Sequence, residues 1–494
     1  MINHIITIII TLFLALVSNF NYLRSEVIIT PEASSGFTTK NETRTSKFMV
    51  STANPNASKA GFNIIKNGGN ALDAAIASQL VLNIVEPQSS GIGGGAFIVF
   101  WDNQKKKLYT YDGRETAPKS ADPYLFINKD GEIIKRSSAT IGGKSVGVPG
   151  LIKVMELAHK KHGKLSWKKL FNPAITIANE GFRISPRLFK LLSLDKTLRE
   201  IPDTSKYFYN NKDTPLPIGS ILRNYPLAKT LKEISEIGAT SFYNGQLAKD
   251  IIKKVHSTDK NPGSLTLNDL KSYKAFYRDP ICGGYKEFIV CGPPPPSSGG
   301  IGVIQTLGIL EKFNLSKMKP WSVEALNIFI EANRLMFSDR ALYIADPDFF
   351  PVPTKELINK NYLRQRASLI SINSKLPVTL PGKFKNFNLK KLSKGKNIEL
   401  ESTTHISIID KEGNAISMTS SIEAAFGSHL MVNGFLLNNQ LTDFSYKAIK
   451  EKKVVANQVV GGKRPRSSMA PIVILNKYNE IVALTGSAGG PSII

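Results

Sequence analysis

Residues 402–419 read STTHISIIDKEGNAISMT, and the interpretation of the whole chain starts from this stretch. Residues 404–409 and 415–419 are rich in β-formers that alternate with polar residues, as half-buried strands do. The five residues between them, Asp410 to Asn414, include Gly413 and predict a hairpin turn. Directly upstream, residues 381–401 are rich in lysine and lack an apolar period, so we expect an exposed basic linker there.

A threonine at the junction of a linker and a strand is a candidate nucleophile. A hydroxyl reacts poorly at neutral pH unless a base lies beside it. Cleavage of the chain before a threonine would supply that base, because the freed α-amine has a pKa of about 8. Threonine is also an ordinary strand residue, so the junction alone leaves both interpretations open.

The remainder of the chain predicts an α+β protein built in layers. Residues 185–370 are expected to be mostly helical, and Pro293 to Gly300 to form a rigid connection. Helices are predicted at 57–66, 71–85, 150–161 and 166–180, and further strands at 96–101, 108–111, 434–437, 471–475 and 481–484.

The first 25 residues resemble a targeting segment. Ile5 to Val17 is an apolar run that is short for a membrane span and suits the core of a signal peptide. No Lys or Arg precedes the run and no clean cleavage site follows it, so an uncleaved anchor is the alternative. Residues 26–47 would be a loose leader. Both alternatives predict a periplasmic or secreted protein, which contacts a membrane only if the segment is retained.

Several other functional classes are disfavoured by composition and spacing. The formal charge is +25, but the lysines are dispersed, so we do not expect nucleic-acid binding. His159 and His162 are expected on a solvated helix face, and no metal site or cofactor is predicted. Cys282 and Cys291 could form one disulfide in an oxidising compartment or lie separately in the core.

From Phe48 to Ile494 the chain resembles the γ-glutamyltransferase family of N-terminal-nucleophile hydrolases. Single pieces of the resemblance are weak, but their ordered series is specific. The matching pieces are residues 68–75 (GGNALDAA), 93–95 (GGG), 112–118 (DGRETAP), 146–150 (VGVPG), 294–300 (PPPSSGG), 403–405 (TTH), 437–440 (LNNQ) with 443–444 (DF), 464–465 (RP) with 467–469 (SSM), and 486–490 (GSAGG).

The resemblance implies a self-cleaving precursor with a four-layer αββα sandwich. Thr403 would attack its own preceding peptide bond and then serve as the catalytic nucleophile. The large subunit, 48–402, would end at Ser402, and the small subunit would be 403–494. Ser421 stands where the family usually has a supporting Thr. Gly489 and Gly490 would form the oxyanion hole.

The resemblance also assigns the two charged ends of a γ-glutamyl substrate. Arg114, Ser467 and Ser468 would bind the α-carboxylate, and Gln440 and Asp443 would bind the α-ammonium. Three departures are evident. Glu423 replaces an Asn that contacts the α-amino group, residues 445–462 of a possible lid are rich in Lys, and only 92 residues follow Ser402. We therefore expect the small subunit to be C-terminally incomplete.

The predicted activity is that of a γ-glutamyltransferase, or glutathione hydrolase, without a cofactor. The enzyme would take the γ-glutamyl group of glutathione or a related amide onto Thr403 and pass it to water, an amino acid or a dipeptide. Glu423 leaves open a glutaryl-type amide acylase on the same fold. A second alternative is an unprocessed, catalytically silent surface binding protein.

Overall fold

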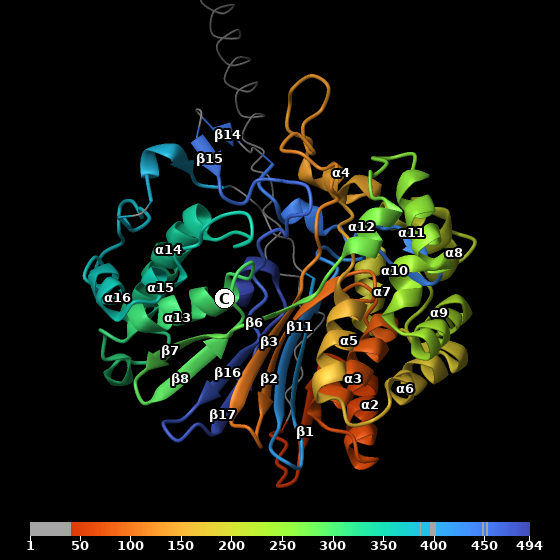
Figure 1. Ribbon diagram of the computed structural model, residues 1–494, viewed down its shortest axis with the longest axis horizontal. Helices are drawn as coiled ribbons and strands as arrows, with labels where there is room; N and C mark the ends of the chain where they lie inside the picture. The colour runs from red at the N-terminus through yellow and green to blue at the C-terminus, as the bar shows by residue number, and fades with distance from the viewer. Residues whose placement is uncertain (1–40, 386, 396–401, 447–448, 451–452) are drawn as a thin grey trace, which may run out of the picture. The chain divides into compact units, whose positions relative to one another are not determined.

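The computed structural model describes residues 41–385, 387–395, 402–446, 449–450 and 453–494 (Figure 1). The predicted targeting segment, the leader up to residue 40 and the last six residues of the linker lie outside this part. Within the described residues, none of the helices has the length and apolar character that a membrane crossing requires.

Two antiparallel sheets form the centre of residues 41–494, and the predicted hairpin lies inside the larger one. This sheet has the strand order β1-β10-β11-β2-β3-β6. The smaller sheet has the order β17-β16-β8-β7. The strands of the larger sheet, in that order, are Met49–Thr52, Thr404–Ile409, Ala415–Ser421, Gly95–Asp102, Lys107–Gly113 and Phe276–Arg278, and those of the smaller are Ile481–Thr485, Ile472–Leu475, Phe288–Gly292 and Ile281–Tyr285.

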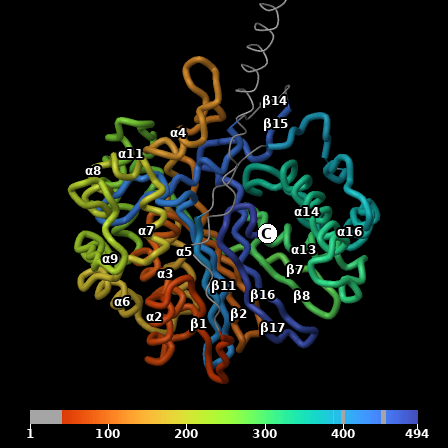
Figure 2. Tube along the Cα trace, turned by 180° about the vertical axis from the view of Figure 1, so that it is seen from behind, coloured from red at the N-terminus to blue at the C-terminus, as the bar shows by residue number. Residues whose placement is uncertain are grey.

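Helices cover the outer face of each sheet, so the sequence of layers is helix, sheet, sheet, helix (Figures 1 and 2). The larger sheet is covered by α2 Pro55–Lys66, α3 Ala71–Val85, α5 Leu151–His162, α6 Trp167–Glu180, α7 Pro186–Leu194, α8 Pro202–Phe208, α9 Tyr225–Ile237, α10 Ala239–Asn244, α11 Gln246–His256 and α12 Leu267–Ser272. The smaller sheet is covered by α13 Gly299–Leu310, α14 Val323–Tyr343, α15 Thr354–Leu357 and α16 Lys360–Ala367. The predicted αββα sandwich is confirmed.

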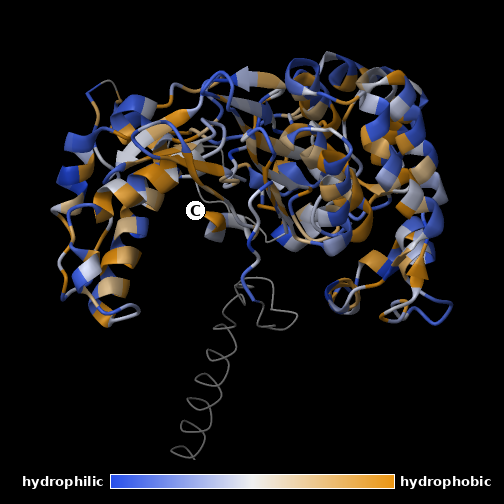
Figure 3. Cartoon of the chain, turned by 90° about the horizontal axis from the view of Figure 1, so that it is seen from below, coloured by the Kyte–Doolittle hydropathy of each residue, from blue (hydrophilic) through white to orange (hydrophobic). Residues whose placement is uncertain are grey.

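Hydrophobic residues run along the strands and the sheet-facing sides of the helices (Figure 3). One cluster lies between the two sheets, where Trp101 and Ala415 from the larger sheet meet Val473 and Leu475 from the smaller one. This apolar layer packs the two sheets face to face. The packing brings segments that are distant in sequence to the same end of the sandwich.

The β10–β11 hairpin is anchored at its turn to the fully buried helix α3. Asn70 caps this helix, since its side chain accepts from the Asp73 N–H and the Asp73 carboxylate accepts from the Asn70 N–H. The turn carboxylate of Asp410 accepts a further hydrogen bond, 2.9 Å long, from the N–H of Ala71. A carboxylate is favourable at a helix N-terminus, so the hairpin is held at the end opposite the predicted nucleophile.

The segment 276–292 differs from the prediction, because it contributes three strands to a region expected to be mostly helical. Strands β7 and β8 are five residues each and are joined at Lys286 and Glu287. Strand β7 carries Gly283 and Gly284, which weaken a strand pattern in sequence. Gly283 packs closely under α13, where a Cβ would meet Ile304. Helix α13 begins at Gly299, so the last two residues of the predicted connection belong to it.

The basic linker is not simply exposed. Phe384 and Phe387 pack against the cluster under the smaller sheet, and β9, Leu392–Ser393, pairs in parallel with β15, Lys453–Val455. Strand β14, Ile449–Lys450, completes this small sheet. The remaining short strands are β4 Phe182–Arg183, β5 Ile221–Leu222, β12 Met431–Val432 and β13 Phe435–Leu436.

The prediction of a solvated face for the two histidines of α5 is wrong. His162 is half-buried and its Nε2 lies 2.7 Å from the hydroxyl of Tyr111, and burial lowers its pKa to about 4. His159 lies 2.8 Å from the carbonyl of Leu165 and 3.7 Å from the carboxylate of Asp73. Both histidines therefore serve the packing of α5.

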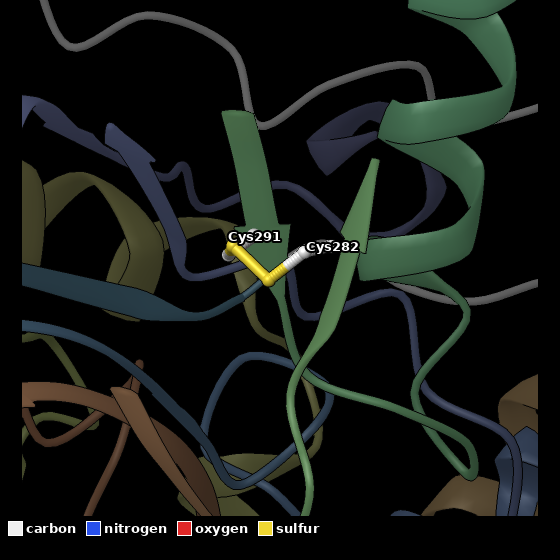
Figure 4. Close-up of a disulfide and its surroundings, with 2 residues drawn as sticks. All are labelled: Cys282 and Cys291. Carbon is white, nitrogen blue, oxygen red and sulfur yellow. A yellow bond between two sulfur atoms is a disulfide. The ribbon is translucent and has the colours of Figure 1, made fainter. Parts of the chain in front are cut away.

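Cys282 and Cys291 form a disulfide (Figure 4). The two residues are directly opposite each other on β7 and β8. Of the two alternatives that the sequence leaves open, the structure has the bridge.

Candidate active site

Two hydroxyl groups converge on the peptide bond before Thr403. The Thr403 Oγ1 donates to the carbonyl oxygen of Ser402 at 2.6 Å, and the Ser421 Oγ donates to the same oxygen at 2.9 Å. The Ser421 Oγ also accepts from the N–H of Glu423 at 2.8 Å. All of these residues are buried. The nucleophile candidate thus lies against the bond that it would cut.

Strand register places these two hydroxyls together. Thr404 pairs with Ser420 across the hairpin, so the preceding Thr403 lies opposite Ser421. Alternation puts Thr403 and His405 on the face toward the smaller sheet, while Thr404 lies on the helix-covered face with Ile406. Ser421 in turn pairs with Gly95 of β2.

The glycine run before β2 allows this close packing. A Cβ on Gly94 would come within 2.1 Å of the Ser421 carbonyl, and one on Gly93 equally near the Leu436 carbonyl. Only glycine lets the backbone of this turn lie directly on the strand that carries the site.

The residues expected to bind opposite ends of the substrate are linked to one another. The Arg114 Nη2 donates to Asp443 Oδ2 at 2.6 Å, and the Gln440 Nε2 donates to the same oxygen at 2.7 Å. The Arg114 Nε donates to the Pro465 carbonyl at 3.1 Å. Arg114 is only 1% exposed, so its guanidinium is held rigidly by a carboxylate and by the backbone of the segment that carries Ser467.

The two serines are supported from the large-subunit side by residues that the sequence interpretation did not assign. The Ser467 carbonyl accepts from both the N–H and the Oγ of Ser298, at 2.8 and 2.6 Å. The Arg340 guanidinium donates to the Ser298 Oγ at 2.8 Å and to the Ser468 Oγ at 2.7 Å. Ser298 is part of the motif at 294–300, whereas no local signal distinguishes Arg340 on α14.

Both carboxylate oxygens of Glu423 accept hydrogen bonds. One carboxylate oxygen accepts from Arg136 at 2.7 Å, and the other accepts from the side-chain amide of Asn439. Glu423 has a φ of 78°, a left-handed conformation that non-glycine residues rarely adopt. This conformation and the Ser421–Glu423 hydrogen bond turn the chain sharply at the end of β11. Arg136 was also not assigned from the sequence.

The predicted residues converge on one small cavity of about 20 Å³. That volume holds about one water molecule. Gly489 directly precedes a lining residue and has a φ of 136°, and Ser402 directly precedes Thr403. The lining residues are Arg114, Thr403, Ser421, Glu423, Gln440, Asp443, Ser467, Ser468, Met469, Gly490 and Ile493.

A buried carboxyl lies directly behind this site. Burial raises the pKa of Glu115 to about 8, and the adjacent Arg114 guanidinium, 3.7 Å away, offsets part of the rise. Neither carboxyl oxygen has a hydrogen-bond partner among the described residues. Across the part of the chain that the structure describes, no three His, Cys, Asp or Glu side chains are grouped as metal ligands.

The four-layer sandwich and the buried threonine at a strand terminus define an N-terminal-nucleophile hydrolase. The family model described as gamma-glutamyltranspeptidase matches residues 57–494. A glutathione hydrolase proenzyme of Bacillus subtilis strain 168 is 40% identical over 453 residues, which are 90% of this chain and 76% of that protein. The Escherichia coli K12 glutathione hydrolase proenzyme is 35% identical over 461 residues, 91% of this chain and 77% of that protein. The chain belongs to the γ-glutamyltranspeptidase family.

Solved structures agree with this assignment. The γ-glutamyltranspeptidase of Helicobacter pylori is 33% identical with a TM-score of 0.66 and covers 70% of this chain and 99% of its own. A cephalosporin acylase from Bacillus halodurans is 26% identical with a TM-score of 0.78 and covers 94% of this chain and 82% of its own.

Proposed function

We propose that this chain is the precursor of a γ-glutamyl transferase and hydrolase that cuts itself between Ser402 and Thr403. The observation that carries the proposal is the pair of hydroxyls, from Thr403 and Ser421, on the carbonyl oxygen of Ser402. Family membership and the convergence of the substrate-binding residues on the same cavity support it.

Self-cleavage would proceed through an ester. The Thr403 Oγ1 attacks the carbonyl carbon of Ser402, and the Ser421 hydroxyl stabilises the negative charge that develops on the carbonyl oxygen. The peptide nitrogen takes up a proton and leaves, so that Ser402 is bound as an ester to the Thr403 oxygen. This step already frees the α-amine of Thr403. Water then hydrolyses the ester, which releases the Ser402 carboxylate and restores the Thr403 hydroxyl.

The mature nucleophile would act on the γ-amide of glutathione or a related donor. The α-amine accepts the proton of the Thr403 hydroxyl, and the oxygen attacks the γ-carbonyl carbon. The N–H groups of Gly489 and Gly490 would stabilise the oxyanion, and the amine of the donor leaves with a proton. Water or the amine of an amino acid or peptide then takes the γ-glutamyl group from the ester.

Charge complementarity supports a γ-glutamyl donor. Arg114, Ser467 and Ser468 offer donors for an α-carboxylate, and Gln440, Asp443 and Glu423 offer acceptors for an α-ammonium. We also propose a periplasmic or secreted location, which the Cys282–Cys291 disulfide supports because such bridges persist in oxidising compartments.

A glutaryl-type acylase is the second candidate, and one observation favours it. Arg136 already neutralises Glu423, so the site has a cation where an α-ammonium would lie. The likeness to a cephalosporin acylase is in line with this candidate.

The experiment compares cleavage and turnover. Wild-type protein is expected to yield two fragments whose small member begins with Thr403, and Thr403→Ala to remain one band. Thr403→Ser keeps a hydroxyl and serves as the matched control. The mature protein is expected to prefer γ-glutamyl anilide to glutaryl anilide. Preference for glutaryl anilide would favour the acylase, and an uncut, inactive wild type would favour a silent binding protein.

A further inference from the structure

The site contains a cation that the proposed mechanism does not use. Arg136 begins the short helix α4, Arg136–Thr140, in the excursion formed by residues 119–140, which we call the arm. Its Nη2 lies 2.7 Å from Glu423 Oε1 and 3.9 Å from Asp443 Oδ1, and its Nη1 donates to the Thr442 carbonyl at 3.1 Å. The Arg136 side chain is 15% exposed and that of Glu423 is 2% exposed, so this ion pair is largely removed from water.

The arm holds Arg136 in this place by apolar packing. The Phe126 ring stacks on the Tyr446 ring with centroids 4.3 Å apart. Phe126 and Ala139 of the arm also share a buried cluster with Leu441 and Phe444, which flank Asp443. Two hydrogen bonds fix the base of the arm, because the Asn261 side-chain amide donates to the carbonyls of residues 138 and 141, at 2.7 and 3.1 Å. Arg136 is therefore presented by a support that packs directly on the acceptor residues.

The Arg136 guanidinium occupies the position that a substrate ammonium needs. Glu423 and Asp443 are 3% and 4% exposed, and buried carboxylates require a cationic partner. Arg114 pairs with Asp443, whereas Arg136 pairs with Glu423 and also lies within 4 Å of Asp443.

We propose that Arg136 is a latch that imitates the α-ammonium of the donor in the unliganded protein. An incoming γ-glutamyl donor replaces the Arg136 guanidinium with its own ammonium between Glu423 and Asp443, so the carboxylates keep a cation throughout. A glutaryl donor brings no ammonium and leaves Arg136 in place. Arg136 thus determines how strongly the site distinguishes donors with an α-ammonium from donors without one. This inference rests on the proposed function.

The latch predicts the sign of a change in KM. A binding site that is occupied by its own chain has an apparent affinity reduced by the fraction of molecules in the open state. Arg136→Met is therefore expected to lower the KM for γ-glutamyl anilide by about three- to tenfold, with kcat within about twofold of wild type. The KM for glutaryl anilide should stay unchanged. Self-cleavage should proceed as in wild type, because the groups on the Ser402 carbonyl oxygen are the hydroxyls of Thr403 and Ser421, which the substitution leaves in place.

Two companion variants make the test specific. Lys135→Met removes one positive charge from the neighbouring, exposed position of the arm and should leave both KM values unchanged. Arg136→Lys keeps the charge and should give a smaller fall in KM than Arg136→Met. A KM for γ-glutamyl anilide that is unchanged or higher in Arg136→Met overturns the proposal. A fall shared equally by the two anilides also overturns it, because that would indicate a steric rather than an ammonium-specific effect.

A second measurement separates this inference from the proposed function. The concentration of glutamate that half-maximally raises the melting temperature should be lower for Arg136→Met than for wild type, whereas that of glutarate should not change. This readout needs no turnover. If wild-type protein cleaves neither itself nor an anilide, the proposed function fails, and glutamate binding still decides the latch. The latch proposal is overturned if the glutamate concentration that half-maximally raises the melting temperature is the same for Arg136→Met and wild type.

Discussion

Ser421→Ala tests the geometry of self-cleavage most directly. The Ser421 hydroxyl is one of two groups on the Ser402 carbonyl oxygen, 2.9 Å away, and it accepts the Glu423 N–H. Removing one preorganised donor from a developing oxyanion typically raises a barrier by about 3 kcal/mol, which slows the step by roughly a hundredfold. The variant also leaves the buried Glu423 N–H without its acceptor, at a cost of about 1–3 kcal/mol in folding stability. The substitution leaves the Thr403 side chain, the candidate nucleophile, unchanged.

The assay follows the conversion of newly synthesised precursor into two fragments by denaturing electrophoresis. The rate constant for Ser421→Ala should be about 100 times smaller than that of wild type, and its melting temperature should be lower. Ser421→Thr keeps the hydroxyl and should cleave within a few-fold of wild type. The reasoning is refuted if Ser421→Ala matures within threefold of wild type while its fold is intact by melting temperature.

Three further predictions concern the surroundings of the site. Arg114→Lys loses the hydrogen bonds to the Pro465 and Arg466 carbonyls, so the KM for γ-glutamyl anilide should rise about 10- to 100-fold. Steady-state kinetics would measure this rise, and an unchanged KM would contradict the prediction. The raised pKa of Glu115 means that the folded protein holds this proton more tightly than the unfolded chain, so its stabilising contribution is complete below about pH 4.5 and is lost as the pH rises to about 8. In urea unfolding, the stability of Glu115→Gln relative to wild type should therefore increase between pH 5 and 8, by at most about 1.4 kcal/mol per pH unit, and a constant difference would be evidence against it. Replacing Cys282 and Cys291 by Ser opens a ten-residue loop and should lower the free energy of unfolding by about 2–3 kcal/mol. The variant should therefore have a lower melting temperature than wild type, and equal melting temperatures would show that the disulfide does not stabilise the fold.

The strand that follows the candidate nucleophile could be predicted from local sequence, whereas the choice of Thr403 came from the resemblance of the whole chain to the family. The alternation in 404–409, the Gly413 turn and the second run at 415–419 specify a hairpin, and strand register then places position 403 opposite position 421. Helix 71–85 was equally predictable, because it is rich in apolar residues at helical spacing and ends just before Pro87. These features depend on residues that are close together along the chain.

Strands β7 and β8 and the packing of the linker could not be predicted in the same way. Strand β7 is five residues long and contains two glycines, so its period is weak. It pairs with β8, and β8 in turn is held in the sheet because Cys291 and Val290 pair with Val473 and Ile474 from a distant segment. The same reason applies to Phe384 and Phe387, which have an apolar surface to pack on only after α13 and α14 are in place.

The sequence by itself determined which family the chain belongs to and which residues are candidates for the chemistry, since the ordered motifs point to Thr403, Arg114 and Asp443 without any coordinates. Only the tertiary structure decided how their charges are paired. Arg136 meets Glu423 across 287 positions, and Arg114 meets Asp443 across 329. Buried charges must be neutralised by whatever groups the fold brings within a few ångströms, and no pattern along the chain encodes that distance.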